Sequence, residues 1–319
     1  MVTNAEIEVR KFMSILVVGS VAFDGIETPF GKVERAIGGS ATYFSVAASF
    51  FTPVQLVAVV GEDFSDKEME VFRGRDIDVS GLSRTQGKTF SWRGSYDYDM
   101  NVATTRETQL NVFADFKPVL SDSFRSAKVV FLANIDPELQ LEVLEQVRSP
   151  RLVALDTMNY WITSKKEALK KIFSRVDLII INEGEVRQFS GEANLIKGAR
   201  TILSLGAKTI VIKRGEYGVL MVKKDEVFAV PAFPLETVFD PTGAGDTFAG
   251  GFLGYLASRS DHSESVMRRA IIFGSVLASF TVEAFALDRL REVSRREIDS
   301  RFRQFKTLTH FDDLEEAES

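Results

Sequence analysis

Residues 240–253 read Asp-Pro-Thr-Gly-Ala-Gly-Asp-Thr-Phe-Ala-Gly-Gly-Phe-Leu, and they join a turn to the start of a helix. The first four residues disfavour regular structure, because proline fixes φ and glycine allows left-handed backbone. From Thr247 onward the side chains are almost all small or apolar, which predicts a buried helix. Each of Gly250, Gly251 and Gly254 costs about 1 kcal/mol against alanine inside a helix, so we expect close packing against a neighbour there.

The glycines at the start of this helix predict an anion-binding site. Gly243, Ala244 and Gly245 would stand where unpaired backbone N–H groups and the helix dipole favour negative charge. Asp246 follows directly, and a lone aspartate before a helix is most simply a capping residue. A carboxylate beside an anion hole can also take a proton from a hydroxyl group that attacks a bound phosphoryl group.

The run from Asp240 to Phe248 closely resembles the C-terminal signature of the ribokinase-like carbohydrate kinases, the PfkB family. The resemblance extends from about Met13 to about residue 305. It implies that Asp246 is the catalytic base and that the segment Gly243–Gly245, with Ala244 at its centre, binds the transferring phosphate. It further implies ATP and Mg²⁺ as cofactors, and K⁺ held near Asp240 and Thr242.

The composition of the chain excludes several other classes of function. The chain has 319 residues, 45% of them hydrophobic, which is enough for one large α/β domain or two smaller ones. Its net charge of −6 and the absence of a long basic run argue against a nucleic-acid partner. Without cysteine, disulfides, thiolate nucleophiles and cysteine metal sites are excluded.

The ends of the chain and its hydropathy suggest no membrane partner. No apolar run reaches the roughly 18 residues of a membrane span, and the polar N-terminus lacks the apolar core of a signal peptide. We therefore expect a cytoplasmic protein. Residues 1–12 are interpreted as an N-terminal extension and residues 309–319 as an acidic tail.

Short apolar runs separated by helical patterns predict an α/β fold. The runs typical of buried parallel strands are 15–19, 56–60, 129–132, 152–155, 178–181 and 209–212. Helical patterns such as 137–147 and 193–205 lie between them, which predicts a mainly parallel sheet with helices on both faces. Ligands in such sheets bind beyond the carboxyl ends of the strands.

Asp24 and the pair Gly38-Gly39 follow the first of these strands. By themselves they indicate a turn and a closely packed helix start. Together they resemble the N-terminal signature of the same family, which implies that Asp24 holds sugar hydroxyls and that the glycines shape the sugar pocket. Ser40 and Tyr43 extend this substrate site, and Tyr43 stands at about the place where the family often has asparagine. We also assign Asn111 to the substrate site.

Residues 89–112 interrupt the α/β rhythm with strict alternation. Phe90, Trp92, Tyr96 and Tyr98 would share one face of a strand, a turn follows at Asp99–Asn101, and a second strand is predicted over 102–112. The aromatic face either packs on the core or belongs to a lid. The resemblance favours the lid, with residues 24–37 supplying its other strands and a homodimer contact through it.

Two further strand ends carry polar residues. Asp156 and Asn159 would contact substrate hydroxyls, although a surface turn explains them equally well. Asn182 and Glu185 match the family's Asn-x-x-Glu element, which implies ATP and Mg²⁺ binding, with Glu185 acting through water. A capped surface helix is the alternative for this pair.

The remaining expected ATP-binding residues are assigned by resemblance. Lys213, Gly215 and Gly218 follow a buried strand, where the family's chain passes close to the nucleotide. Lys213 stands where a threonine is frequent in the family. Gly274 lies in a predicted helix over 270–284 that would form a wall of the adenine site.

We therefore expect one ribokinase-like domain over residues 13–308, a mainly parallel sheet with helices on both faces plus a small β-sheet lid, with lid segments at about 24–37 and 88–113. Its expected activity is ATP-dependent phosphorylation of a primary hydroxyl group of a sugar. A nucleoside kinase, in which Tyr43 and the lid aromatics stack a base, is the alternative. A non-catalytic sugar or nucleotide sensor is another. A Rossmann dehydrogenase is disfavoured, because Phe248 occupies the position of the third glycine.

Overall fold

The computed structural model describes residues 14–312. The expected N-terminal extension, residues 1–12, and positions 313–319 of the expected acidic tail lie outside the described residues. Within residues 14–312, no helix is long and apolar enough to cross a membrane.

A nine-stranded sheet forms the centre of the body, in the order β13-β12-β11-β10-β9-β8-β1-β4-β5. The strands are β1 (Ile15–Val18), β4 (Val54–Val60), β5 (Ile77–Arg84), β8 (Val129–Leu132), β9 (Leu152–Asp156), β10 (Leu178–Asn182), β11 (Thr209–Lys213), β12 (Val219–Val222) and β13 (Val227–Val230). All neighbours pair in parallel except β11 with β12 and β12 with β13. The predicted buried parallel strands are confirmed, and an antiparallel edge follows β11.

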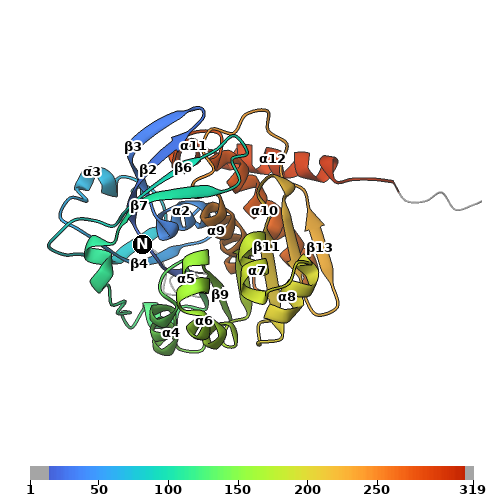
Figure 1. The fold of residues 1–319 in the computed structure, drawn as a ribbon, viewed down its shortest axis with the longest axis horizontal. Helices are drawn as coiled ribbons and strands as arrows, with labels where there is room; N and C mark the ends of the chain where they lie inside the picture. Colours follow the sequence, from blue (N-terminus) through green and yellow to red (C-terminus); the bar gives the residue numbers. More distant parts are fainter. Residues whose placement is uncertain (1–13, 313–319) are drawn as a thin grey trace, which may run out of the picture.

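Helices cover both faces of this sheet (Figure 1). Alternate side chains of β1 belong to apolar clusters on opposite faces of the sheet, and each cluster is covered by helices. Ile15 and Val17 belong to the first cluster, whereas Leu16 and Val18 belong to the second. The first cluster includes residues of α2 (Ser40–Ala48), α9 (Ala244–Ala257) and α10 (Glu264–Thr281), and the second includes residues of α4 (Pro137–Gln146), α6 (Lys166–Phe173), α7 (Glu183–Ser190) and α8 (Leu195–Leu203). The other helices are α3 (Asp66–Met69), α5 (Asn159–Ser164), α11 (Asp288–Glu292) and α12 (Arg295–Leu308), with 3₁₀ turns η1 (Asn111–Asp115), η2 (Phe124–Ser126) and η3 (Gly215–Tyr217). Burial on both faces explains the continuous apolar runs of the strands.

The glycines of α9 allow it to lie unusually close to its neighbours. A Cβ on Gly250 would collide with the backbone oxygen of Phe44 in α2, and one on Gly254 would stand 2.7 Å from the Cα of Ala48. On the other side, a Cβ on Gly251 would stand 2.9 Å from the backbone oxygen of Phe273 in α10. The predicted close packing is confirmed, and it fixes the position of the helix start described below.

A second, four-stranded sheet in the order β3-β2-β6-β7 stands above the carboxyl ends of the body strands (Figure 1). Its strands are β2 (Ala22–Thr28), β3 (Gly31–Gly38), β6 (Ser91–Tyr96) and β7 (Ala103–Gln109). Asp24 pairs in register with Trp92, so these two side chains lie on the same face as Tyr96. We call this sheet the lid, and the face with Asp24 its inner face.

The hairpin of the lid differs from the predicted one in its second strand. β7 ends at Gln109 instead of continuing to residue 112, because the chain turns into η1 at Asn111, which has a left-handed φ of 49°. Tyr98 is 88% exposed in the connecting turn and does not join the aromatic face. Phe90 precedes the strand and stacks on Phe113, with ring centroids 5.3 Å apart.

We expect Gly250→Ala to lower the free energy of unfolding by about 2 kcal/mol, measured by urea denaturation, because overpacking against α2 exceeds the gain in helix propensity. Gly184→Ala, at an exposed position in the first turn of α7, is the matched control and should change stability by less than about 1 kcal/mol. Equal effects of the two variants would contradict the importance of the close helix contact.

Candidate active site

The start of α9 lies at the centre of the hollow between the lid and the body. Gly243 is the N-cap residue with a left-handed φ of 74°, and no side chain caps this helix. Asp246 is therefore in the first turn and is not the capping residue. A Cβ on Gly243 would collide with the ring of Tyr43, so this ring supports the loop from behind. The Ala244 N–H donates to the Pro241 backbone oxygen at 3.2 Å, and the other backbone N–H groups at this helix start have the arrangement that binds anions.

Asp240 anchors the loop that leads into α9. Its side chain is fully buried and accepts hydrogen bonds from the backbone N–H groups of Thr242 and Ala286, each at 2.8 Å. The Thr242 hydroxyl donates to the Tyr96 hydroxyl at 3.3 Å. The lid is thus joined to the anion-binding loop by a hydrogen bond that the aromatic pattern alone did not indicate.

Asp24 enters the same hollow from the lid. It is 5% exposed, and it lies so close to Gly38 that a Cβ there would overlap its carboxylate. Burial raises the pKa of Asp24 to about 7, opposed by the N–H of Gly39, and the charges of Asp246 and Asp240 raise it further. Gly38 and Gly39 therefore hold Asp24 in place, as the predicted sugar pocket requires.

Asp246 has a raised pKa for related reasons. Burial raises its pKa to about 7, the charge of Asp156 adds to the increase, and Lys213 opposes it. A carboxyl group with this pKa exists in both protonation states near neutral pH. It is therefore suited to accept a proton from a hydroxyl group.

A buried ion pair lies beside Asp246. The Lys213 Nζ is 2.7 Å from the Asp156 Oδ2, with only 19% and 4% of the two side chains exposed. Burial raises the pKa of Asp156, and Lys213 lowers it. The sequence placed both residues after buried strands, hence at one edge of the sheet, but it did not indicate that they pair.

Asn182 and Glu185 form a capping box at the start of α7. The Asn182 side chain accepts from the Glu185 N–H and the Glu185 carboxylate accepts from the Asn182 N–H, each at 2.8 Å. A capped helix is what the alternative interpretation of Asn182 and Glu185 predicted. Glu185 is nevertheless buried close to the ion pair: burial raises its pKa to about 7, Asp156 raises it further and Lys213 lowers it.

The tip of the lid contacts the turn that follows β11. The Asn101 Nδ2 donates to the Glu216 Oε1 at 3.1 Å, and a Cβ on Gly215, which has a left-handed φ of 54°, would collide with the Asn101 Oδ1. A Cβ on Gly218 would collide with the backbone oxygen of Val230. A turn is present where ATP binding was predicted, and nothing in the sequence indicated its contact with the lid.

Several predicted substrate residues lie apart from the hollow or are turned away from it. Tyr43 is 1% exposed beneath Gly243, so its ring cannot stack a base; that part of the nucleoside alternative was wrong. The Ser40 hydroxyl is hydrogen-bonded to Ser20 at 3.1 Å. Asn159 is exposed at the start of α5. Gly274 is buried in the contact of α10 with α9, where a Cβ would stand 2.8 Å from Phe248.

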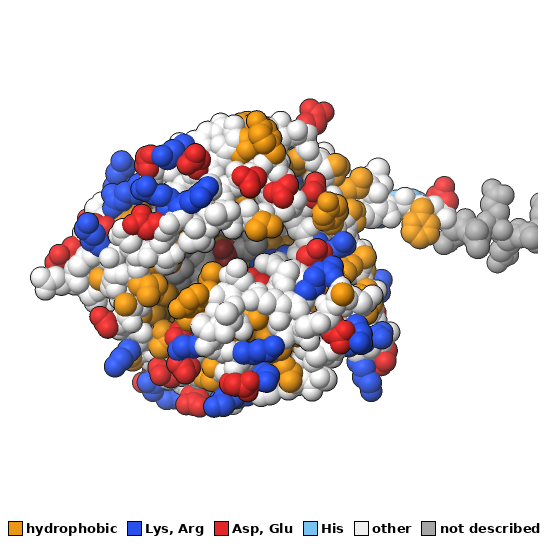
Figure 2. All heavy atoms as spheres, in the orientation of Figure 1, with side chains coloured by type: hydrophobic (Ala, Val, Ile, Leu, Met, Phe, Trp, Pro, Cys, Tyr) orange, Lys and Arg blue, Asp and Glu red, His pale blue; other side chains and the backbone are white. Residues whose placement is uncertain are grey.

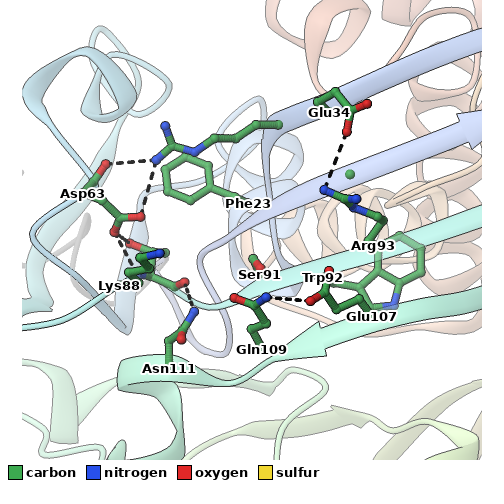
Figure 3. Close-up of a pocket in the computed structure, with 13 residues that line it drawn as sticks. Phe23, Glu34, Asp63, Lys88, Ser91, Trp92, Arg93, Glu107, Gln109 and Asn111 are labelled. Atoms are coloured by element: carbon green, nitrogen blue, oxygen red, sulfur yellow. Dashed lines mark hydrogen bonds and ion pairs between the residues drawn. The ribbon is translucent and has the colours of Figure 1, made fainter.

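A cavity of about 460 Å³ lies against the lid, and Figure 3 shows side chains that line it. Its lining includes Phe23, Arg35, Trp92, Arg93 and Asn111, but not Asp24. Asn111 donates from its Nδ2 to the Thr89 backbone oxygen at 2.9 Å, so the structure does not bring it to Asp246. Strand alternation explains why Asp24 is absent from this lining, because Phe23 and Arg93 lie on the opposite face of their strands. Trp92 pairs in register with Asp24 and also borders this cavity.

The hollow itself is visible in Figure 2 between the lid and the helices below it, with acidic side chains inside. Among residues 14–312, no three acidic or histidine side chains are grouped as ligands of a metal ion. The arrangement combines an anion-binding helix start, a carboxyl group with a pKa of about 7 and an ammonium group. These are the parts needed for transfer of a phosphoryl group to a hydroxyl.

Comparisons with known proteins show the family and the fold of the chain. Residues 14–289 match the family described as pfkB family carbohydrate kinase. A cytidine kinase of Thermococcus kodakarensis is 32% identical over 254 residues, covering 77% of this chain and 90% of the relative. A nucleoside kinase of Methanocaldococcus jannaschii is 26% identical over 233 residues, covering 72% of this chain and 73% of that protein. The crystal structure of a nucleoside kinase from the same organism has a TM-score of 0.74 at 21% identity, covering 92% of this chain and 98% of that one.

We expect Asp246→Asn to raise the free energy of unfolding by about 1–3 kcal/mol at pH 8 and to leave it nearly unchanged at pH 4. With a pKa of about 7, the native carboxyl keeps its proton while the unfolded one ionises above its ordinary value of 3.8. Native stability therefore falls as pH rises from about 4 to 7, and asparagine removes this loss. Urea denaturation at pH 4 and pH 8 measures the change in the free energy of unfolding, and Asp97→Asn, at an exposed position, is the control. An equal effect of Asp246→Asn at both pH values would contradict the raised pKa.

Proposed function

Because this chain belongs to the PfkB family of carbohydrate kinases, which it matches over residues 14–289, we propose that it phosphorylates the primary hydroxyl group of a nucleoside with ATP as the donor. That the chain is a carbohydrate or nucleoside kinase with the ribokinase-like fold follows from the comparisons, and the predicted family and fold class are confirmed. The nucleoside as substrate is the proposal.

One observation carries the proposal: Asp24 and Trp92 lie side by side on the inner face of the lid. The Trp92 indole is partly exposed and lies flat over Gly94, where a Cβ would collide with it. A ribose that donates its hydroxyl groups to Asp24 would leave its base near this indole, and stacking on an aromatic ring stabilises a base. The 32% identity to a cytidine kinase supports the same substrate class.

The proposed reaction uses the residues in the hollow as follows. Asp24 accepts hydrogen bonds from the sugar hydroxyls and directs the primary hydroxyl toward Asp246. The segment Gly243–Gly245 holds the γ-phosphoryl group of ATP, with the N–H groups of Gly243 and Gly245 as donors, because the Ala244 N–H donates to the Pro241 oxygen. A bond forms between the hydroxyl oxygen and the γ-phosphorus, the bond from that phosphorus to the bridging oxygen of ADP breaks, and Asp246 receives the hydroxyl proton. The lid excludes water, which limits hydrolysis of ATP.

The proposed nucleotide site lies on the β10–β11 side of the hollow. Asn182, Lys213, Gly215 and Gly218 border it in this proposal, with Gly274 setting the distance between α10 and α9 behind it. Glu185 would hold Mg²⁺ through water, since Mg²⁺ keeps several waters and takes phosphate oxygens as ligands. The ion would neutralise charge on the phosphates. A K⁺ requirement through Asp240 and Thr242 is part of the proposal and is tested by replacing K⁺ with Na⁺ in the assay.

A sugar kinase is the second candidate, because Asp24 and the glycines beside it would hold the hydroxyls of a free sugar equally well. A homodimer through the lid is also proposed. In such a dimer the outer faces of the lids would meet, and these carry charged side chains such as Arg93, Glu34 and Glu107. The Tyr96 hydroxyl contacts Thr242 in the hollow instead, and Trp92 pairs in register with Asp24 while it also borders the cavity against the lid.

The proposed function is tested by measuring ATP- and Mg²⁺-dependent phosphorylation of cytidine, adenosine, ribose and other sugars. We expect turnover of a nucleoside, and we expect Asp246→Asn to lower kcat about 10²–10⁴-fold while remaining folded. Turnover of a free sugar alone would favour the second candidate. Ligand binding without any phosphorylation would favour a sensor, and full activity of Asp246→Asn would overturn the assignment of the base.

We expect kcat/KM to rise as pH increases from 5.5 to 8.5, with an apparent pKa of about 7. The base must be deprotonated to accept a proton, and its burial favours the protonated form below that pH. Asp24, Glu185, Asp156 and Lys213 interact electrostatically in the same hollow, so the measured value belongs to the group. A flat profile over this range would contradict a base with a raised pKa.

A further inference from the structure

The ammonium group of Lys213 stands directly beside the anion-binding loop. Lys213 is the last residue of β11 and pairs in register with Asn182, the last residue of β10. Its Nζ is 3.1 Å from the point where a Cβ on Gly245 would lie. A larger residue at position 245 would crowd this ammonium group, so the glycine gives Lys213 access to the first turn of α9.

Lys213 is surrounded by acidic groups from several elements. Its Nζ is 2.7 Å from the Asp156 Oδ2. Burial works to lower its pKa, but the charges of Asp156, Glu185 and Asp246 outweigh burial and hold the pKa above its usual value. The group is therefore a permanent cation among the carboxyl groups of Asp156, Glu185 and Asp246. An anionic nucleotide entering this hollow would meet net repulsion without a cation.

We propose that Lys213 is a catalytic residue that donates a hydrogen bond to the γ-phosphoryl group during transfer while it remains bound to Asp156. This inference rests on the kinase function proposed above and adds a role to it. An ammonium group has three donors on a compact charge, so it can bond a carboxylate and a phosphate oxygen at once. Asp156 then orients Lys213 instead of contacting substrate hydroxyls.

The proposed contact changes no covalent step. The hydroxyl oxygen bonds to the γ-phosphorus, ADP leaves with its bridging oxygen, and the proton goes to Asp246. Lys213 keeps its proton throughout and offsets negative charge on the non-bridging oxygens as the phosphoryl group moves. Donors fixed in a site that excludes water stabilise such charge more strongly than water does.

If Lys213 had a purely structural role, its removal would have a different effect. In that case the lysine serves only to neutralise the buried Asp156, and removing it alone would leave an unpaired buried charge. The single variant Lys213→Met cannot separate the two roles for this reason. The double variant Lys213→Met/Asp156→Asn can, because it removes both charges together at similar side-chain volumes.

The experiment compares kcat of Asp156→Asn with that of the double variant. We expect the double variant to be slower by about 10²-fold or more, the loss typical of removing one donor to transition-state charge, with little change in the KM for the nucleoside. Values within about threefold of each other would show that Lys213 acts only through Asp156 and would overturn the proposal. Lys208→Met, at an exposed ion pair with Asp177 just before β11, is the matched control.

Nucleotide binding gives a second readout that does not need turnover. We expect the double variant to bind β,γ-imido-ATP at least about tenfold more weakly than Asp156→Asn does, which corresponds to about 1.4 kcal/mol, and to bind ADP nearly as well. Equal loss for both nucleotides would overturn the contact with the γ-phosphoryl group. If the wild type phosphorylates nothing in the substrate panel, the proposed function fails, and the binding comparison still decides where the Lys213 ammonium lies.

Discussion

The close contact between α9 and α2 is the constraint on which the site depends. Without side chains at Gly250 and Gly254, the two helices approach until backbone meets backbone. This contact carries the first turn of α9 over the ring of Tyr43 and into the hollow beneath the lid. The helix dipole and the start of α9 are thereby placed in the same hollow as Asp24 and Asp246.

Buried charge is the second property of the site. Asp24, Asp156, Glu185 and Asp246 lie within one hollow, each with a pKa that burial raises. Holding carboxylates in this way opposes folding at neutral pH, and the Asp156–Lys213 pair and the N–H groups of Gly39 and Asn182 offset part of the cost. Stability is therefore lost in the hollow, while the two apolar clusters on the sheet stabilise the fold.

The sequence predicted the fold in most respects, because the apolar runs and glycine-rich helix start are local signals. The extent of β7 was missed, since the left-handed turn at Asn111 ends an otherwise regular alternation. For the site, Asp24, Gly38, Gly39 and Asp246 were predicted to lie together, and the structure brings them together. The Lys213–Asp156 pair, the Tyr96–Thr242 bond and the burial of Tyr43 could not be predicted, because each joins segments far apart in the chain.

The contact of Asn101 with Gly215 and Glu216 joins the two sides of the hollow across 115 positions of sequence. The lid covers the side with Asp24, whereas the turn after β11 borders the side with Lys213. One asparagine side chain therefore links the hairpin tip to this turn. Any movement of the lid away from the turn must first break these hydrogen bonds, so the position of the lid depends on the turn after β11 as well as on its own sheet.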